Sequence, residues 1–300
     1  MPTDLLPVNA DRMGTGPASP PTILAFDSGL GGLTVFAELR RAWPGARFVY
    51  VADDAAFPYG ALEETALVAR VLSVMERFIA LHAPDVAVIA CNTASTLVLP
   101  HLRARFAIPF VGTVPAIKPA AASSQTKTIS VLATPGTVRR DYTRGLIESF
   151  ASGCRVTLVG SVRLAALAEA ELSGAPASDE EIAAEIAPCF VEDAAGRTDA
   201  VVLACTHYPL LLPRLRRLAP WPVAWIDPAP AIARRVTEVI AGRRAATDDA
   251  NAGEPRQDGL AVFTSGRDVP RPLREALQLR GLGVVASDSL PLVPSSLPLT

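Results

Sequence analysis

The sequence predicts an α/β fold of two pseudo-symmetric lobes, each a parallel sheet flanked by helices, with an active site in the cleft between the lobes. Three observations support this prediction. Apolar, β-branched runs alternate with segments of helical spacing along most of the chain. Residues 85–95, DVAVIACNTAS, are echoed by residues 199–209, DAVVLACTHYP. Polar residues follow the apolar runs, where the strands of a parallel sheet would end.

The first lobe is expected to comprise residues 22–114 and to regain residues 224–245 later in the chain. Residues 1–21 are rich in Pro, Gly, Ser and Asp without periodicity, which predicts a disordered tail. Apolar runs predict strands at residues 22–26, 47–52, 85–90 and 109–112. Helical spacing predicts helices at residues 33–42, 62–81 and 93–105.

The second lobe is expected over residues 115–223, where the alternation restarts. Its strands are predicted at residues 128–133 and 155–159 and in the run that ends at Cys205, with a further strand at 223–226. Its helices are predicted at residues 138–150, 163–172, 178–195 and 210–218, and the helix at 231–240 follows them. Residues 246–300 are assigned to a linker and a C-terminal extension of unknown role, with a strand at 260–264 and a helix at 271–279.

The composition excludes several functional classes. Half of the residues are hydrophobic, and the 28 basic and 30 acidic residues give a net charge of −2. A nucleic-acid or membrane-surface binder would show a basic excess instead. No apolar run reaches the length of a transmembrane helix, and the N-terminus lacks the pattern of a secretory signal. We therefore expect a cytoplasmic protein whose cysteines stay reduced.

Reactive and polar groups gather at the predicted strand ends. Since the strands themselves are almost wholly apolar, that edge is where a small polar ligand would be held. The groups are Asp27, Ser28, Tyr59, Cys91, Asn92, Thr93, Thr113, Thr134, Cys205, Thr206, His207 and Asp227.

Cys91 and Cys205 end the two echoed runs, so two facing lobes would place their thiols on opposite walls of one cleft. Opposed thiols suit the inversion of a carbon that bears hydrogen. A thiolate removes the proton from one face and a thiol returns a proton to the other. His207, two residues beyond Cys205, and Asp27, at a neighbouring strand end, would adjust their protonation.

Cofactors and metals are not expected. Pyridoxal phosphate would need a lysine for its Schiff base, and the chain has only Lys118 and Lys127. The glycine loop after Asp27 carries Thr34 where a dinucleotide fingerprint has its third glycine. A structural zinc site built on the Cys205 motif would want a fourth ligand that the sequence does not offer.

Five short motifs occur in order along the chain: FDSGLGG at 26–32, FPYG at 57–60, ACNTAS at 90–95, TPGT at 134–137 and CTHYP at 205–209. Together they resemble the motifs of the glutamate racemases, within the wider aspartate/glutamate racemase superfamily. The resemblance covers residues 22–241. It implies cofactor-free interconversion of L- and D-glutamate, which supplies D-glutamate for bacterial peptidoglycan.

The resemblance also implies residue roles. Cys91 and Cys205 would be the two bases, assisted by Asp27 and His207, and Glu169 falls where the family often has an acid near the second cysteine. Tyr59 and Gly60 would receive the side-chain carboxylate of the substrate, and Asp27, Ser28, Asn92, Thr93 and Thr206 its α-amino and α-carboxylate groups. Substrate-binding residues are then Asp27, Ser28, Pro58, Tyr59, Gly60, Cys91, Asn92, Thr93, Thr134, Cys205, Thr206 and His207.

Two alternatives stay open beside glutamate. One is a racemase or isomerase of the same superfamily that acts on aspartate or another acid. The other is a non-catalytic binding or regulatory relative, although such a protein has no physical need for two matched thiols. The expected partner is the small-molecule substrate glutamate, with no nucleic acid or membrane, and the sequence leaves a homodimer open.

Overall fold

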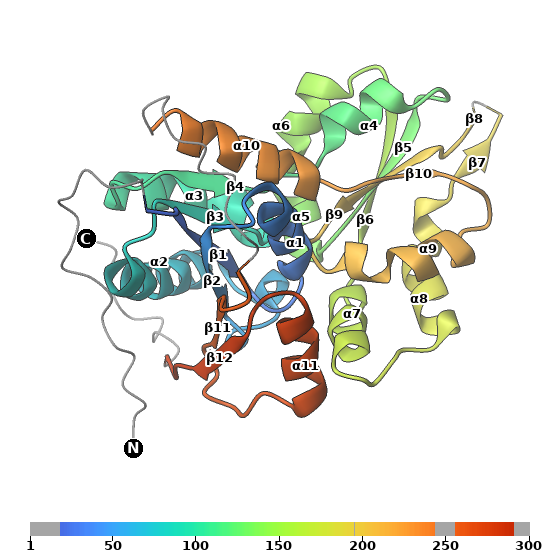
Figure 1. The fold of residues 1–300 in the computed structure, drawn as a ribbon. Helices are drawn as coiled ribbons and strands as arrows, with labels where there is room; N and C mark the ends of the chain where they lie inside the picture. The colour runs from blue at the N-terminus through green and yellow to red at the C-terminus, as the bar shows by residue number, and fades with distance from the viewer. Residues whose placement is uncertain (1–18, 195, 244–255, 291–300) are drawn as a thin grey trace.

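A computed structural model of the chain describes residues 19–194, 196–243 and 256–290. These residues form two lobes, each built on its own parallel sheet flanked by helices (Figure 1). The predicted fold class is therefore confirmed. Most of the N-terminal tail predicted over residues 1–21, and most of the predicted linker, lie outside the described residues.

The first lobe contains a six-stranded sheet in the order β12-β11-β2-β1-β3-β4, in which all neighbouring strands are parallel. Its strands are β1 (Thr22–Asp27), β2 (Arg47–Ala52), β3 (Val86–Ile89), β4 (Phe110–Gly112), β11 (Leu260–Phe263) and β12 (Val284–Ser287). Its helices are α1 (Leu33–Ala42), α2 (Glu64–His82), α3 (Asn92–Arg105), α10 (Ala229–Ala241) and α11 (Arg271–Leu279), with a 3-10 turn η1 (Tyr59–Ala61).

Both faces of this sheet are covered, which explains why its strands are continuously apolar rather than alternating. Alternate residues of β1 point to opposite faces. Ile23 and Ala25 pack in one hydrophobic cluster with side chains of α1, α10 and α11. Leu24 and Phe26 pack in a second cluster with side chains of α2 and α3. Because the sheet is fixed between these two layers, the residues that follow its strands are held at one edge.

The second lobe contains a four-stranded parallel sheet in the order β10-β9-β5-β6. Its strands are β5 (Thr128–Ala133), β6 (Arg155–Gly160), β9 (Ala200–Ala204) and β10 (Ala224–Ile226). Its helices are α4 (Ile117–Ser123), α5 (Pro135–Arg139), α6 (Asp141–Phe150), α7 (Leu164–Leu172), α8 (Asp179–Ile186) and α9 (Leu212–Leu218). The lobe also has the 3-10 turns η2 (Ala187–Cys189) and η3 (Tyr208–Leu211) and the antiparallel pair β7 (Glu192–Asp193) and β8 (Gly196–Arg197).

Two of the helices predicted for this lobe are wrong in part. The helix expected over residues 138–150 is divided into α5 and α6, because Arg140 between them has an extended backbone. The helix expected over 178–195 ends at Ile186, since Pro188 has no N–H to continue the helical hydrogen bonds. Helix α4 was not predicted, because its seven residues are too few to show helical spacing.

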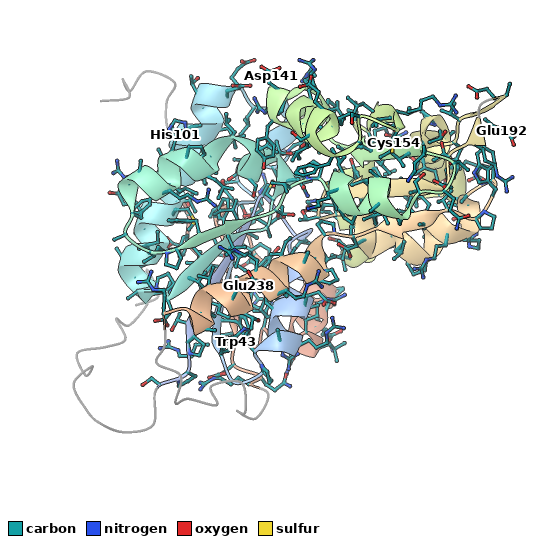
Figure 2. All side chains as sticks on the ribbon, turned by 90° about the horizontal axis from the view of Figure 1, so that it is seen from above. Trp43, His101, Asp141, Cys154, Glu192 and Glu238 are labelled. Atoms are coloured by element: carbon teal, nitrogen blue, oxygen red, sulfur yellow. The ribbon has the colours of Figure 1, made fainter. Side chains whose placement is uncertain are left out.

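The chain returns to the first lobe later than predicted. Strand β10 pairs with β9 of the second sheet, so residues 224–226 do not belong to the first lobe. The return is made by α10, which packs beside α1 (Figure 2). Trp43 Nε1, next to the end of α1, donates a hydrogen bond to Thr237 Oγ1 of α10 at 3.0 Å.

The C-terminal part of the chain is an integral part of the first lobe. Residues 246–300 were expected to be a linker and an extension of unknown role, and that division is wrong for the residues described. Strand β11 pairs in parallel with β2, aligning Leu260 with Val49, and β12 extends the sheet further. Helix α11 buries Leu273 and Leu277 in the core cluster shared with α1 and α10.

Candidate active site

A small cavity lies between the lobes, at the carboxyl ends of strands from both sheets. It has a volume of about 20 Å³, which is room for about one water molecule. Both echoed cysteines line it, Cys91 at 5% exposure and Cys205 at 6%. The lining residues are Ser28, Phe57, Pro58, Tyr59, Gly60, Cys91, Asn92, Thr93, Thr134, Ala165, Cys205, Thr206 and His207.

Cys91 comes directly after β3 and is the residue before the first turn of α3. Its thiol donates to Ser28 Oγ at 3.6 Å. Burial raises the pKa of this thiol to about 12, and the charge of Asp27 raises it further against the opposing effects of the Ala94 N–H and Ser28 hydrogen bonds. Cys91 is therefore a thiol in this structure, in the state that can donate a proton.

Cys205 occupies the equivalent position after β9, and its Sγ lies 3.7 Å from His207 Nδ1. The other ring nitrogen, Nε2, lies 2.8 Å from Glu169 Oε1. Burial by itself disfavours a charged imidazole, but the hydrogen bonds to Cys205 and Glu169 and the charge of Asp27 outweigh it. The pKa of His207 is therefore raised well above its usual value. An imidazolium beside Cys205 stabilises the thiolate form of that cysteine.

Asp27 ends β1 and lies behind the cavity wall, fully buried. Its carboxylate accepts hydrogen bonds from the Gly29 N–H at 3.1 Å and from Thr206 Oγ1 of the other lobe at 3.2 Å. Burial raises the pKa of Asp27, while the charge of His207 and the N–H groups of Gly29 and Gly32 oppose the increase. Asp27 is thus placed to exchange protons or hydrogen bonds near Cys91.

The glycine loop after Asp27 lets the two lobes approach closely. A Cβ at Gly29 would lie 2.0 Å from Glu169 Oε1, and one at Gly31 would lie 2.4 Å from His207 Nδ1. The same glutamate oxygen accepts the Leu30 N–H at 2.8 Å. Only glycine at these two positions leaves space for the second lobe's histidine and glutamate.

Hydroxyl groups join the lobes on the other side of the cavity. Thr93 Oγ1 of α3 lies 3.0 Å from Thr134 Oγ1 and 3.3 Å from Thr137 Oγ1, both in the second lobe. Thr134 also caps α5 by accepting the Thr137 N–H. Beside this cluster, both polar side-chain atoms of Asn92 are buried and have no hydrogen-bond partner among the described residues. A substrate with polar groups would satisfy them.

The structure brings most of the predicted site residues together. Eleven of the twelve predicted substrate-binding residues line the cavity, and the twelfth, Asp27, is bonded to the lining residue Thr206. Glu169, predicted near the second cysteine, contacts His207. Two lining residues, Phe57 and Ala165, were not proposed. Phe57 stands inside the FPYG motif and its ring centroid lies 5.4 Å from that of His207, so the motif itself was the available signal.

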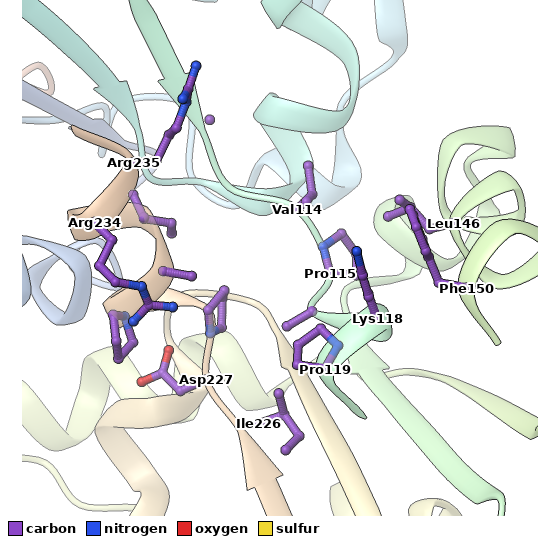
Figure 3. Close-up of a pocket in the computed structure, with 16 residues that line it drawn as sticks. Val114, Pro115, Lys118, Pro119, Leu146, Phe150, Ile226, Asp227, Arg234 and Arg235 are labelled. Carbon is purple, nitrogen blue, oxygen red and sulfur yellow. The ribbon is translucent and has the colours of Figure 1, made fainter. Parts of the chain in front are cut away.

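Asp227, grouped by the sequence with the strand-end edge, lies instead in a second and larger cavity of about 390 Å³ (Figure 3). Its walls are the two segments that connect the lobes, together with Leu146 and Phe150 of α6. Lys118, Arg234 and Arg235 are the cationic residues among its lining. Neither echoed cysteine lines this cavity, so it is separate from the thiol site.

Within residues 19–194, 196–243 and 256–290, no group of three or more His, Cys, Asp or Glu side chains is placed to hold a metal ion. Over the same residues, no helix has both the length and the apolar character needed to span a membrane. The chemistry of the thiol cavity therefore has to be derived from the protein groups that line it.

Comparisons with known proteins match this arrangement. A family model for Asp/Glu/hydantoin racemases matches residues 34–236. The chain is 55% identical over 275 residues to a glutamate racemase of Brucella canis, covering 90% of this chain and 97% of the relative. It is 54% identical to the glutamate racemase of Brucella anthropi, covering 87% and 92%.

A solved structure agrees with these sequence relatives. Glutamate racemase of Escherichia coli, in complex with L-glutamate and the activator UDP-MurNAc-ala, has a TM-score of 0.81 and 37% identity to this chain. The superposition covers 90% of this chain and 98% of that one. The similarity therefore extends over both lobes.

Proposed function

The chain belongs to the glutamate racemases of the Asp/Glu/hydantoin racemase family, and from that membership we propose that Cys91 and Cys205 invert glutamate by a two-base proton transfer. The enzyme interconverts L- and D-glutamate and supplies the D-enantiomer for peptidoglycan synthesis. The observation that supports the two-base mechanism is the presence of both thiols in one closed cavity, each beside a different polar assistant.

The protonation states in the structure favour one direction of transfer. The His207 imidazolium stabilises a Cys205 thiolate, while Cys91 keeps its proton. The Cys205 thiolate takes the α-proton from one face of glutamate and becomes a thiol. Cys91 donates its proton to the opposite face of the resulting carbanion and becomes a thiolate. The completed turnover leaves the opposite protonation state, which is the one required for the reverse reaction.

Substrate groups are assigned to the polar atoms around the thiols. The α-ammonium group is placed against Asp27 and Ser28. The α-carboxylate is placed against the unpaired amide of Asn92 and the hydroxyl of Thr93, at the N-terminus of α3, where backbone N–H groups favour an anion. The side-chain carboxylate is placed against the backbone of Tyr59 and Gly60. This arrangement directs the α-carbon between the two cysteines.

The lobes must separate before glutamate can enter, because a cavity of about 20 Å³ holds little more than a water molecule. Opening breaks hydrogen bonds that join the lobes, including Thr206 to Asp27 and the Leu30 N–H to Glu169. The closed state in turn excludes water, which strengthens the electrostatic interactions around the carbanion. A substrate that bridges both lobes would replace the broken contacts.

Circular dichroism of L-glutamate in deuterated water, with purified enzyme and no added cofactor, tests the proposal. We expect the signal to decay to zero and deuterium to appear at the α-carbon, since enantiomers have equal free energy. L-aspartate in a parallel reaction tests the alternative acid substrate, and we expect a much slower decay. Folded, reduced protein that changes neither amino acid would overturn the proposal and favour a non-catalytic relative.

We also propose that the second cavity receives an anionic activator. The Escherichia coli relative was solved with L-glutamate and UDP-MurNAc-ala together, and two ligands bound at once need two sites. In this chain the second cavity is separate from the thiols, is lined by Lys118, Arg234 and Arg235, and borders both connections between the lobes. A ligand there would alter lobe closure.

Titration calorimetry with UDP-MurNAc-Ala tests this activator site. Binding to the wild type and at least tenfold weaker binding to Arg234→Gln are expected, because a charge-assisted hydrogen bond contributes about 1.5–3 kcal/mol. Arg216→Gln, an exposed arginine on α9 outside the cavity lining, is the matched control. Equal binding by wild type and Arg234→Gln would exclude this cavity as the site.

The proposal places the enzyme in the cytoplasm, where thiols stay reduced. Its partner is the small-molecule substrate glutamate. A homodimer stays a prediction, and light scattering of the purified protein would test it.

A further inference from the structure

Asp53 is a fully buried carboxylate that the catalytic mechanism does not use. It follows β2, and its backbone N–H donates to the Asp27 carbonyl at 2.8 Å. Its side chain accepts hydrogen bonds from three separate parts of the first lobe. Arg70 of α2 donates from Nε at 2.9 Å, Thr264 donates from Oγ1 at 2.5 Å, and the Tyr59 hydroxyl also donates to it.

The network begins in the C-terminal part of the chain and ends in the wall of the thiol cavity. Thr264 comes directly after β11, and its backbone N–H donates to Ala52, the last residue of β2. Arg70 contacts the same C-terminal part by donating from Nη1 to the Leu290 carbonyl at 3.1 Å. Tyr59 lines the cavity next to Gly60. A residue pair more than 200 positions apart is thus connected through one carboxylate.

The hydroxyl of Tyr59 has a single proton, and that proton is donated to Asp53. Burial and the neighbouring Asp53 charge raise the pKa of Tyr59 well above its usual value, so the phenol stays protonated. It therefore has no proton left for a substrate carboxylate. What Tyr59 and Gly60 offer a carboxylate is their backbone N–H groups, which have no hydrogen-bond partner among the described residues.

We infer that Asp53 is a positioning residue that holds Tyr59, and with it the backbone N–H groups of residues 59–60, where the side-chain carboxylate of glutamate binds. This inference rests on the proposed function, because it assigns that carboxylate to Tyr59 and Gly60. Arg70 balances the charge of Asp53, and Thr264 fixes its orientation from the C-terminal strand. The C-terminal residues therefore contribute to substrate recognition without touching the substrate.

The inference predicts a change in the Michaelis constant rather than in the turnover number. A displaced carboxylate subsite weakens the binding of glutamate but leaves both thiols and their assistants in place. Thr264→Val keeps the shape of the side chain and removes its hydroxyl, so we expect KM for glutamate to rise about tenfold with kcat within about twofold. Thr264→Ser keeps the hydroxyl and should restore the wild-type KM.

Tyr59→Phe provides a second variant, because it releases the ring from Asp53 without altering Arg70 or Thr264. The same increase in KM is expected. Arg77→Gln is the matched control. Arg77 also connects α2 to the C-terminal residues, through an exposed ion pair with Asp288 at 2.6 Å, but it does not reach Asp53. Its KM should equal that of the wild type.

The experiment is a kinetic measurement of all four variants by α-proton exchange of L-glutamate, together with their thermal unfolding midpoints. An unchanged KM in folded Thr264→Val and Tyr59→Phe overturns the inference while the proposed function stands. An equal rise in KM for Arg77→Gln also overturns it, since any loosening of the C-terminal residues would then suffice. Wild-type enzyme that exchanges no α-proton overturns the proposed function, and the inference with it.

Discussion

Glu169 Oε1 lies 2.8 Å from His207 Nε2 and accepts the Leu30 N–H at the same distance. The glutamate and histidine belong to the second lobe, whereas Leu30 belongs to the glycine loop of the first. One carboxylate oxygen thus both supports the charge on the imidazole and joins the closed lobes. The protonation of His207 is therefore connected to closure of the cavity.

Replacing Glu169 with glutamine should slow racemisation. The amide no longer supports the imidazolium, so the thiolate of Cys205 loses part of its stabilisation. Since a hydrogen bond between charged groups contributes about 1.5–3 kcal/mol, kcat/KM should fall roughly tenfold to a hundredfold. Circular dichroism in both directions checks the result. The decrease must be equal for L- and D-glutamate, because their equilibrium constant is one. Unchanged kinetics in both directions would remove Glu169 from the mechanism.

Cys91→Ala and Cys205→Ala should each abolish racemisation, because each removes the only thiol on one face of the substrate. We expect kcat to fall by about 10²–10⁴ or more, the contribution typical of general acid–base catalysis. Cys154→Ala is the control, since that half-buried cysteine lies outside the cavity lining. Near-normal turnover by either of the first two variants, in both directions, would contradict the two-base model.

The free energy of unfolding should decrease as pH rises above about 6.5, the usual pKa of histidine in an unfolded chain. The folded-state pKa of His207 is raised above that value, so the folded protein binds more protons in this range. Its stabilising contribution is fully present below the unfolded pKa and is lost as pH rises through the folded pKa.

Urea denaturation at pH 6, 7 and 8 measures this slope. One such group contributes at most about 1.4 kcal/mol per pH unit. The slope should become shallower in His207→Gln and stay unchanged in His101→Gln, an exposed histidine on α3. Identical slopes for wild type and His207→Gln would show that His207 does not titrate in this range.

The C-terminal residues should be required for folding. Leu277 of α11 is completely buried, whereas Leu279 of the same helix is 84% exposed. Leu277→Ala should lower the free energy of unfolding by about 2–5 kcal/mol, and Leu279→Ala should leave it nearly unchanged. Chemical denaturation compares the two. Equal stability of both variants would mean that α11 is not part of the cooperative core.

From the sequence we expected that removing residues 250–300 would leave the chemistry in place if the protein still folds. The structure leads to a different expectation, because that deletion removes β11, β12 and α11 from the first lobe. The truncated chain should therefore not fold, as circular dichroism in the far ultraviolet would show. A folded and active truncation would contradict the structural assignment.

The sequence by itself determined the features that depend on local patterns. The strand and helix alternation, the glycine loop after Asp27, and the equivalence of Cys91 and Cys205 are all encoded within short windows. Side-chain alternation in strands and helical spacing are local consequences of backbone geometry, so they are visible without a structure. Because parallel strands end at one edge, the same patterns were enough to group nearly all of the cavity residues.

Only the tertiary structure decided which distant segments become neighbours. The pairing of β11 with β2, the assignment of β10 to the second sheet and the connection of Thr264 to Tyr59 through Asp53 depend on contacts far apart in the sequence. An apolar run is compatible with either sheet, since its hydrophobic pattern does not specify a partner strand. The choice follows from which surfaces are buried when the whole chain packs, and that packing also sets the size of the closed cavity.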